Sequence, residues 1–210
     1  MLRVILPKGD FTITAVPKQK YTMEEYLELD ACSDERLEYW DGEIFSMSGV
    51  NDQHDKIESN LHIPLSLRSA GRGCRVFLAN IRIKVPAMPP YRYGDASALC
   101  GSPKFEKIGG VDVLTNPSLI IEVLSTSTEA YDRGDKFTNY KSILTLAEYL
   151  LIAQHRPHVS QFIKQPNGSW LNLEFNALDD VLKVVTLECE LKLSEIYQEV
   201  TFPAAKPNIL

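Results

Sequence analysis

The chain of 210 residues lacks any long, uninterrupted hydrophobic run. Its longest mostly apolar stretches, such as residues 119–124 and 149–153, have the length of a strand and fall far short of the roughly 20 residues that a membrane-spanning helix needs. The N-terminal segment is unlike a signal peptide, because Pro7, Asp10 and Pro17 interrupt its apolar residues. We therefore expect no membrane segment and a cytoplasmic location.

Closely spaced cysteines are also lacking. The four cysteines are widely scattered and form no C-x-x-C motif: they are Cys32, Cys74, Cys100 and Cys189. This spacing predicts neither a zinc site nor a disulfide framework, and it favours reduced, mostly buried thiols.

The third absence is an excess of basic residues. The chain has 22 Lys and Arg against 28 Asp and Glu, which gives a formal net charge of -6. Proteins whose main task is to grip the phosphate backbone of nucleic acids usually have a basic balance. The charge therefore argues against that class of protein.

The composition that is present is typical of one soluble, globular domain. Hydrophobic residues make up 44% of the chain, enough for a substantial core in one domain but not for two comfortable ones. We expect an extended N-terminal arm over residues 1–20, a single domain over residues 21–200 and a C-terminal tail over residues 201–210.

Local patterns predict helices and a hairpin in the first third of this domain. Thr22 and Glu25 have the spacing of a capping box at the start of a helix over residues 23–29. Asp41-Gly42 is a strong turn signal between two short strands, and Gly49 ends that hairpin. Apolar residues every fourth position predict a helix over residues 53–69, with a kink at Pro64.

The rest of the chain reads mainly as strands, which makes the fold class mixed α/β. Residues 74–85 predict one long strand or two linked strands, and residues 93–100 a further strand. Residues 118–124 are almost continuously apolar, which is typical of a strand buried on both faces. A helix over residues 132–143 comes next, then strands over residues 148–153, 159–164 and 170–175, and closing segments over residues 181–187 and 191–200.

Two acidic residues stand out among these strands. Glu122 interrupts the apolar segment on the face of Ile120 and Leu124. Asp95 precedes a strand of small residues that lets another group approach closely. A buried carboxylate is costly unless it is paired or bound to a cation, and two that lie close together are naturally bridged by a hard divalent cation. A plain strand-edge Asp and a Glu paired with Lys or Arg stay open as the alternative at this point.

A series of motifs, in order along the chain, carries a family resemblance. They are Tyr21-Thr22-Met23-Glu24-Glu25-Tyr26, Asp41-Gly42-Glu43-Ile44, Met47-Ser48-Gly49, His54-x-x-Ile57-x-x-Asn60-Leu61, Tyr93-Gly94-Asp95, residues 116–125, Asp132-x-x-x-Lys136-x-x-x-Tyr140 and Glu148-Tyr149-Leu150-Leu151-Ile152. In these motifs the chain resembles the Uma-two family of bacterial proteins, within the restriction-endonuclease-like PD-(D/E)XK superfamily. The resemblance covers residues 21–200.

The resemblance implies a four-stranded mixed sheet flanked by helices, and a metal-dependent DNA endonuclease. It implies that Asp95, Glu122 and the backbone carbonyl of Val123 hold Mg²⁺ or Mn²⁺, and that Lys136 completes the catalytic set. Glu43, His54 and Tyr140 match family positions that support the site, Glu43 by extending the metal's ligand set through water and His54 by contacting phosphate. DNA is the implied substrate, and a homodimer is an implied assembly.

Two positions depart from the superfamily pattern. Leu124 occupies the usual position of the motif lysine, which the resemblance moves to Lys136 on the following helix. Gly94 replaces the usual proline before Asp95, and glycine leaves the backbone freer. These departures and the acidic net charge support an alternative hypothesis, in which the fold serves as a catalytically idle module that binds nucleic acid or protein.

Overall fold

The computed structural model describes residues 19–47 and 51–203. Most of the predicted N-terminal arm, including its strand-like residues 11–16, lies outside the described residues. The same holds for residues 204–210 of the predicted tail and for Gly49, the predicted end of the first hairpin. No helix in the described ranges is long and apolar enough to cross a membrane.

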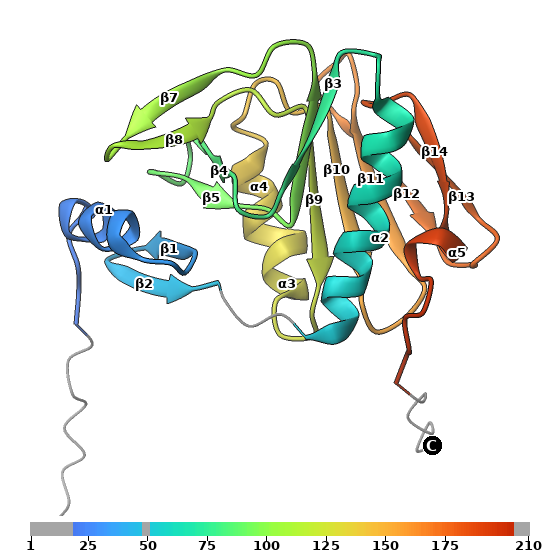
Figure 1. The fold of residues 1–210 in the computed structure, drawn as a ribbon, viewed down its shortest axis with the longest axis horizontal. Helices are drawn as coiled ribbons and strands as arrows, with labels where there is room; N and C mark the ends of the chain where they lie inside the picture. Colours follow the sequence, from blue (N-terminus) through green and yellow to red (C-terminus); the bar gives the residue numbers. More distant parts are fainter. Residues whose placement is uncertain (1–18, 48–50, 204–210) are drawn as a thin grey trace, which may run out of the picture.

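A six-stranded mixed sheet forms the centre of the molecule (Figure 1). Its strands, in spatial order, are β12 (Trp170–Phe175), β11 (Val159–Lys164), β10 (Glu148–Ala153), β9 (Leu119–Leu124), β6 (Ala96–Cys100) and β3 (Cys74–Leu78). β9 and β10 run parallel, and the other neighbours are antiparallel. The sheet is mixed, as expected, but it has six strands instead of four because the chain continues beyond β10 through β11 and β12.

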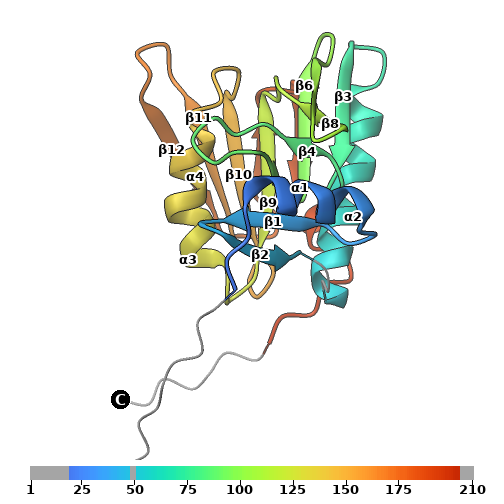
Figure 2. The same cartoon turned by 90° about the vertical axis from the view of Figure 1, so that its left-hand side faces the viewer.

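Helices cover both faces of this sheet (Figures 1 and 2). α2 (Asp52–Ser69) and the short α5 (Leu193–Ile196) pack on one face with the hairpin β13 (Val181–Val184) and β14 (Cys189–Lys192). The other face carries α3 (Glu129–Tyr131), the π-helical turn η1 (Asp132–Lys136) and α4 (Phe137–Tyr140). Every residue of β9 is buried between these layers, which explains why its sequence is apolar apart from Glu122.

Two smaller units lie beside the central sheet. One is α1 (Met23–Cys32) with the hairpin β1 (Leu37–Trp40) and β2 (Glu43–Ser46); the other is a four-stranded sheet of β5 (Arg92–Tyr93), β4 (Arg82–Ile83), β8 (Val111–Leu114) and β7 (Phe105–Ile108). Asp30 of α1 is buried and joins them, because its Oδ2 accepts hydrogen bonds from Arg82 (2.8 Å from Nη2) and Tyr91 (2.7 Å). The N-terminal unit is thereby fixed to β4 and β5.

The predicted helices differ from the observed ones mainly at their ends. α1 has the expected capping box but runs three residues beyond the predicted end at Leu29. α2 begins one residue early, at Asp52, and continues through Pro64. The helix predicted over residues 132–143 begins at Glu129, contains a π-helical turn and ends at Tyr140.

Strand predictions fail mostly where the chain changes sheets. β5 ends at Tyr93 and β6 begins at Ala96, so Gly94 and Asp95 connect two sheets instead of continuing one strand. Residues 74–85 form two strands, β3 and β4, which is one of the two alternatives predicted. The hairpin β7–β8 had no prediction, and α5 lies inside the closing segment 191–200.

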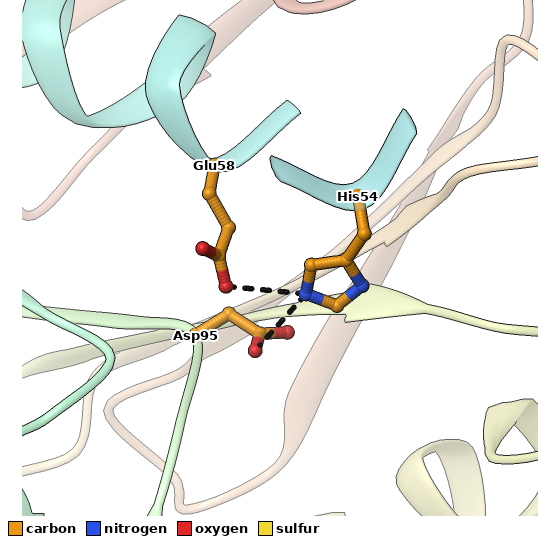
Figure 3. A group of neighbouring side chains, drawn as sticks. All are labelled: His54, Glu58 and Asp95. Carbon is orange, nitrogen blue, oxygen red and sulfur yellow. Dashed lines mark hydrogen bonds and ion pairs between the residues drawn. The ribbon is translucent and has the colours of Figure 1, made fainter. Parts of the chain in front are cut away.

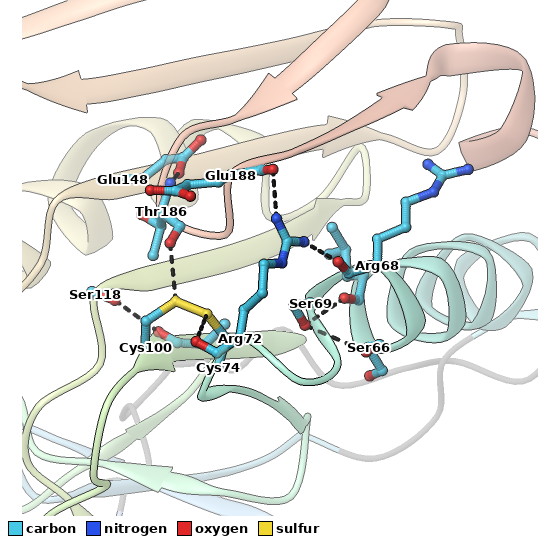
Figure 4. The surroundings of a disulfide bond; sticks show 12 residues. Ser66, Arg68, Ser69, Arg72, Cys74, Cys100, Ser118, Glu148, Thr186 and Glu188 are labelled. Atoms are coloured by element: carbon cyan, nitrogen blue, oxygen red, sulfur yellow. Dashed lines mark hydrogen bonds between the residues drawn. A yellow bond between two sulfur atoms is a disulfide. The ribbon is translucent and has the colours of Figure 1, made fainter.

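The cysteine prediction is wrong for two residues. Cys74 and Cys100 face each other in register on β3 and β6 and form a disulfide (Figure 4). They are 26 residues apart, and strand register, which their spacing does not reveal, brings them together. Cys189 is a buried free thiol, as expected, whereas Cys32 is free but exposed.

Candidate active site

Asp95 lies in the connection between β5 and β6, beside the central strand β9. Its Oδ2 accepts a hydrogen bond of 2.6 Å from the backbone N–H of Val123. A carboxylate that accepts a backbone N–H is held more firmly than one that only meets water. This hydrogen bond from β9 therefore fixes the orientation of the Asp95 carboxylate.

Gly94 allows this connection to approach β9 closely. A Cβ atom at this position would lie 3.1 Å from Cγ2 of Ile120 and 3.4 Å from Oε1 of Glu122. The glycine therefore has a packing role as well as a conformational one. The hydrogen bond from Val123 restrains Asp95 at the point where the superfamily's proline restrains the backbone.

Glu122 is only 4% exposed and has two polar partners. Its Oε1 accepts a hydrogen bond of 2.9 Å from the hydroxyl of Tyr140, and its Oε2 lies 2.9 Å from Nζ of Lys136. The buried acid is thus compensated by a cation and a hydroxyl from the helical segment that covers this face of the sheet.

Lys136 ends the π-helical turn η1 and points back toward β9. Its side chain is buried, and besides Glu122 its Nζ lies 3.5 Å from Oδ1 of Asp132. π-helical turns inside α-helices are frequent at functional sites. Lys136 is therefore not a solvated helix lysine, although it does contact Asp132.

The surroundings of Asp95 and Glu122 shift the pKa values of the two acids in opposite directions. Burial would raise the pKa of Asp95, but the hydrogen bond and charge of His54, together with Lys136, outweigh burial and lower it. Burial raises the pKa of Glu122 well above its usual value, even though Lys136 opposes the rise. Asp95 is therefore the more acidic member of the pair.

Lys136 keeps its positive charge in this setting. Burial alone would lower the pKa of its ammonium group, but the surrounding carboxylates, with Glu122 first, raise it well above the usual value. A buried lysine that remains charged is a fixed, compact positive group at the edge of the site.

The backbone of Tyr93 is held from two sides. Its N–H donates to Oε1 of Glu38 on β1 (2.9 Å), and its carbonyl accepts from the hydroxyl of Tyr140 (3.3 Å). Because that hydroxyl also contacts Glu122, Tyr140 links the Asp95 connection to β9. Tyr140 is fully buried. Its hydroxyl therefore positions Glu122 and the Tyr93 carbonyl, and it does not meet a substrate.

His54 lies on the first turn of α2 and faces Asp95 (Figure 3). Its Nε2 is 3.3 Å from Oδ1 of Asp95 and 3.1 Å from Oε1 of Glu58, one helical turn further along α2. Burial would lower the pKa of His54, but the hydrogen bonds to both carboxylates raise it to about 9. The expected phosphate-contacting histidine is thus engaged by two carboxylates.

One cavity of about 420 Å³ brings these side chains together. Asp95, Glu122, Lys136, His54 and Val123 line it, and further described residues around it include Arg36, Ser125, Thr128, Tyr131, Asp132 and Gln154. Glu43 is not among the described residues that line it; Nζ of Lys20 lies 3.9 Å from its Oε1. The structure therefore gathers the predicted site except Glu43 and the buried Tyr140, which lies behind Glu122.

Comparisons with known proteins show the family to which the chain belongs. The family model Uma2, described as "Putative restriction endonuclease", matches residues 23–195. The chain belongs to the Uma2 (Uma-two) family. Two uncharacterized proteins of Synechocystis sp. are similar to it: one is 31% identical and spans 90% of this chain and 97% of its own, the other is 35% identical and spans 73% and 86%.

A solved structure supports the fold of this Uma2 chain. The crystal structure of a "putative nuclease belonging to DUF820" from Anabaena variabilis superposes with a TM-score of 0.66, and the match covers 83% of this chain and 96% of that one. Its sequence identity is 18%, so the likeness shows the fold alone. The fold is therefore restriction-endonuclease-like, as the family resemblance implied.

The donor atoms of this Uma2 site suit a divalent cation. Carboxylates of Asp95 and Glu122 border one cavity, and oxygen donors of this kind are what Mg²⁺ and Mn²⁺ bind. A second group, His54, Glu58 and Asp95, offers ligand atoms that all lie within 4.8 Å of one another. Asp95 belongs to both sets.

Sequence reasoning missed Glu58. A spacing of four residues after His54 places both side chains on one side of a helix, so the signal was present, but the same spacing also describes an ordinary surface pair. Arg36 and Gln154 at the cavity wall gave no comparable signal, because each is a single polar residue outside the matched motifs.

Proposed function

We propose that the protein is a metal-dependent nuclease that hydrolyses phosphodiester bonds in DNA. One observation carries this proposal: Asp95, Glu122 and Lys136 come from a sheet connection, a central strand and a helical turn, yet they border one cavity with Nζ of Lys136 2.9 Å from Oε2 of Glu122. Family membership and the nuclease-like neighbour support the same reaction class.

Asp95, Glu122 and the backbone carbonyl of Val123 would hold Mg²⁺ or Mn²⁺. When bound, such a cation activates a water molecule and neutralises charge on the scissile phosphate. Asp95 keeps the hydrogen bond from the Val123 N–H, which holds its carboxylate at the cavity. Tyr140 holds Oε1 of Glu122 and thereby fixes the orientation of the second carboxylate.

Lys136 would orient the attacking water or stabilise the negative charge that develops at phosphorus. Preorganised positive groups in a water-poor site are effective because they need little rearrangement during the reaction. The burial of Lys136 and its contacts with Glu122 and Asp132 provide such preorganisation.

Substrate binding has to overcome the net charge of -6. Lys136 and Arg36 are cationic side chains at the cavity, so DNA would be attracted locally and not by the whole surface. A cytoplasmic location and assembly into a homodimer remain predictions.

The decisive experiment measures cleavage of single-stranded and duplex DNA in Mg²⁺ or Mn²⁺. Asp95→Ala, Glu122→Ala and Lys136→Ala should each abolish most of the activity. Asp112→Ala and Lys107→Ala are matched controls, because these exposed residues pair with each other on the β7–β8 hairpin. Cleavage that survives all three cavity substitutions would refute the site.

The alternative is a catalytically idle module, which the acidic net charge favours. That hypothesis predicts no cleavage by the wild-type protein with any divalent cation, while DNA binding or protein binding remains. A filter-binding measurement at several salt concentrations, run beside the cleavage assay, separates the two functions.

A further inference from the structure

We propose that His54, Glu58 and Asp95 form a cation position that takes a transition-metal ion, such as Mn²⁺ or Zn²⁺, in preference to Mg²⁺. The proposal rests on the proposed function in that it names the metal chemistry of the same cavity. Two of its ligands, His54 and Asp95, line that cavity, whereas Glu58 of α2 is not among the described residues that line it.

The distances match those expected of ligands that share one ion. Two donors bound at about 2.1 Å lie roughly 3.0 Å apart at an octahedral angle and roughly 3.4 Å apart at a tetrahedral angle. Nε2 of His54 is 3.1 Å from Oε1 of Glu58 and 3.3 Å from Oδ1 of Asp95 (Figure 3). The ligand atoms of the three side chains all lie within 4.8 Å of one another. A bound ion would take the place of the proton through which His54 now pairs with the two carboxylates.

The fold holds these donors in place before any ion binds. Asn51 caps α2 by accepting the N–H of His54 (3.0 Å). Ile57, Leu61 and Leu65 are buried against the central sheet, so the rotation of α2 about its own axis is fixed. His54 and Glu58, four residues apart, are thereby directed toward Asp95.

The two oxygens of Asp95 serve different neighbours. Oδ2 accepts the N–H of Val123 on β9, whereas Oδ1 faces His54 on α2. Asp95 can therefore contribute to a position on the β9 side with Glu122 and to a separate position on the α2 side. The side chains on the α2 side retain some exposure, at 11% for His54, 23% for Glu58 and 17% for Asp95, so an ion can reach them.

The imidazole of His54 is the ligand that should favour a transition metal over Mg²⁺. Mg²⁺ binds through oxygen ligands and keeps several of its waters, whereas imidazole nitrogen suits transition metals. A site of one histidine and two carboxylates is within the ligand range of Zn²⁺. The β9 position, which has oxygen donors only, lacks this preference.

Electron paramagnetic resonance of Mn²⁺ added to the full-length protein, without DNA, tests the proposal directly. Loss of the free Mn²⁺ signal gives the dissociation constant, and spin-echo modulation detects a directly bound ¹⁴N nucleus. We expect ¹⁴N coupling in the wild-type protein, and we expect Mg²⁺ at tenfold excess to leave most of the Mn²⁺ bound.

Variants assign the ligands. His54→Gln should abolish the ¹⁴N coupling, and both His54→Gln and Glu58→Gln should weaken Mn²⁺ binding at least about tenfold. Glu122→Gln should keep the coupling, because it changes the β9 side only. Asp55→Asn is the matched control, since this exposed acid lies on α2 between His54 and Glu58. Circular dichroism checks that each variant is folded.

Absence of ¹⁴N coupling in Mn²⁺-loaded wild-type protein overturns the proposal without depending on any variant. Displacement of Mn²⁺ by an equal concentration of Mg²⁺ overturns the metal preference. Coupling that is present in a protein without nuclease activity supports the cation position and counts against the proposed function, so the two failures can be told apart.

Discussion

Two glutamates lie in neighbouring central strands and are buried to almost the same degree, but their surroundings differ. Glu148 begins β10 and is 0% exposed, and Glu122 in β9 is 4% exposed. Because side chains alternate along a strand, Glu148 shares the α2 side of the sheet with Leu150 and Ile152. Glu122 shares the α3–α4 side with Ile120 and Leu124.

The partners of Glu148 are neutral donors. Its carboxylate accepts hydrogen bonds from the amide of Gln161 and from the backbone N–H groups of Val185 (3.2 Å) and Thr186 (2.7 Å). These bonds tie the turn after β13 to the central sheet. Glu148 is not among the described residues that line the 420 Å³ cavity. Its role is structural.

The partners of Glu122 are titratable, and one of them, Lys136, lines that cavity. Lys136 and Tyr140 satisfy its two oxygens, and Asp95 of the neighbouring connection lines the same cavity. Burial of a carboxylate therefore marks a costly residue in both strands, but the chemistry of its partners distinguishes the structural acid from the one that we propose to be catalytic.

The largest difference between the two acids should appear in catalysis. Glu122→Gln removes a carboxylate that we propose to bind the metal and should lower the initial rate of DNA cleavage by about 10³-fold. Glu148→Gln should leave the rate of the folded protein nearly unchanged, because its carboxylate faces the other side of the sheet. Equal losses in the two variants, at matched folded fraction, would remove the distinction.

The free energy of unfolding should show the reverse order, with the larger loss on substitution of Glu148 and the smaller on substitution of Glu122. Glu148→Ala removes the acceptor of the part-buried Val185 and Thr186 N–H groups and leaves the Gln161 amide with the Lys183 carbonyl alone. An unsatisfied buried donor costs about 1–3 kcal/mol. We expect the free energy of unfolding in urea to fall by roughly 2–3 kcal/mol, with Glu174→Ala, at an exposed position of the edge strand β12, as a milder comparison. A loss below about 1 kcal/mol would contradict the structural role of Glu148.

The sequence predicts elements whose cause is local. Ile57, Leu61 and Leu65 recur at helical spacing and do form the buried side of α2, and Asp41-Gly42 does make the β1–β2 turn. Elements that depend on distant partners escape this reasoning. The Cys74–Cys100 disulfide arises from the register of β3 and β6, and the break at Gly94 and Asp95 arises because β5 joins a different sheet.

The candidate site is predictable to a similar extent. Glu122 is conspicuous because a charge interrupts an apolar strand, whereas Asp95 and Lys136 gain meaning from the family motifs. The partners of a buried acid cannot be predicted from the sequence. Glu148 also lies in an apolar strand, and its three neutral donors come from residues 13 to 38 positions away. The contacts of His54 with Glu58 and Asp95 likewise cannot be predicted from the sequence, because the approach to Asp95 depends on how α2 packs on the sheet.

Tyr140 offers a smaller test of the Glu122 environment. Tyr140→Phe keeps the ring but removes the hydroxyl that contacts both Glu122 and the Tyr93 carbonyl. We expect a decrease in cleavage rate of about tenfold, since small misplacements of catalytic groups are costly. Tyr197→Phe is the control, because it loses a similar hydrogen bond to the His158 carbonyl at a distance from the cavity. Equal activity of the two variants would deny Tyr140 a positioning role.

The smallest expected effect concerns the space beside Glu122. Gly94→Ala adds a methyl group 3.1 Å from Ile120 and 3.4 Å from Glu122, so the Asp95 connection has to shift by a few tenths of an ångström. A full ångström of misplacement can cost about 10²-fold in rate, so this shift should lower the rate about threefold while the free energy of unfolding changes little. Gly134→Ala, where no atom lies within 4 Å of the added methyl, is the matched control. If Gly94→Ala instead lowers the free energy of unfolding and leaves the rate unchanged, the glycine serves packing alone. The surroundings of Glu122 would then have a structural role, as those of Glu148 do, despite their different partners.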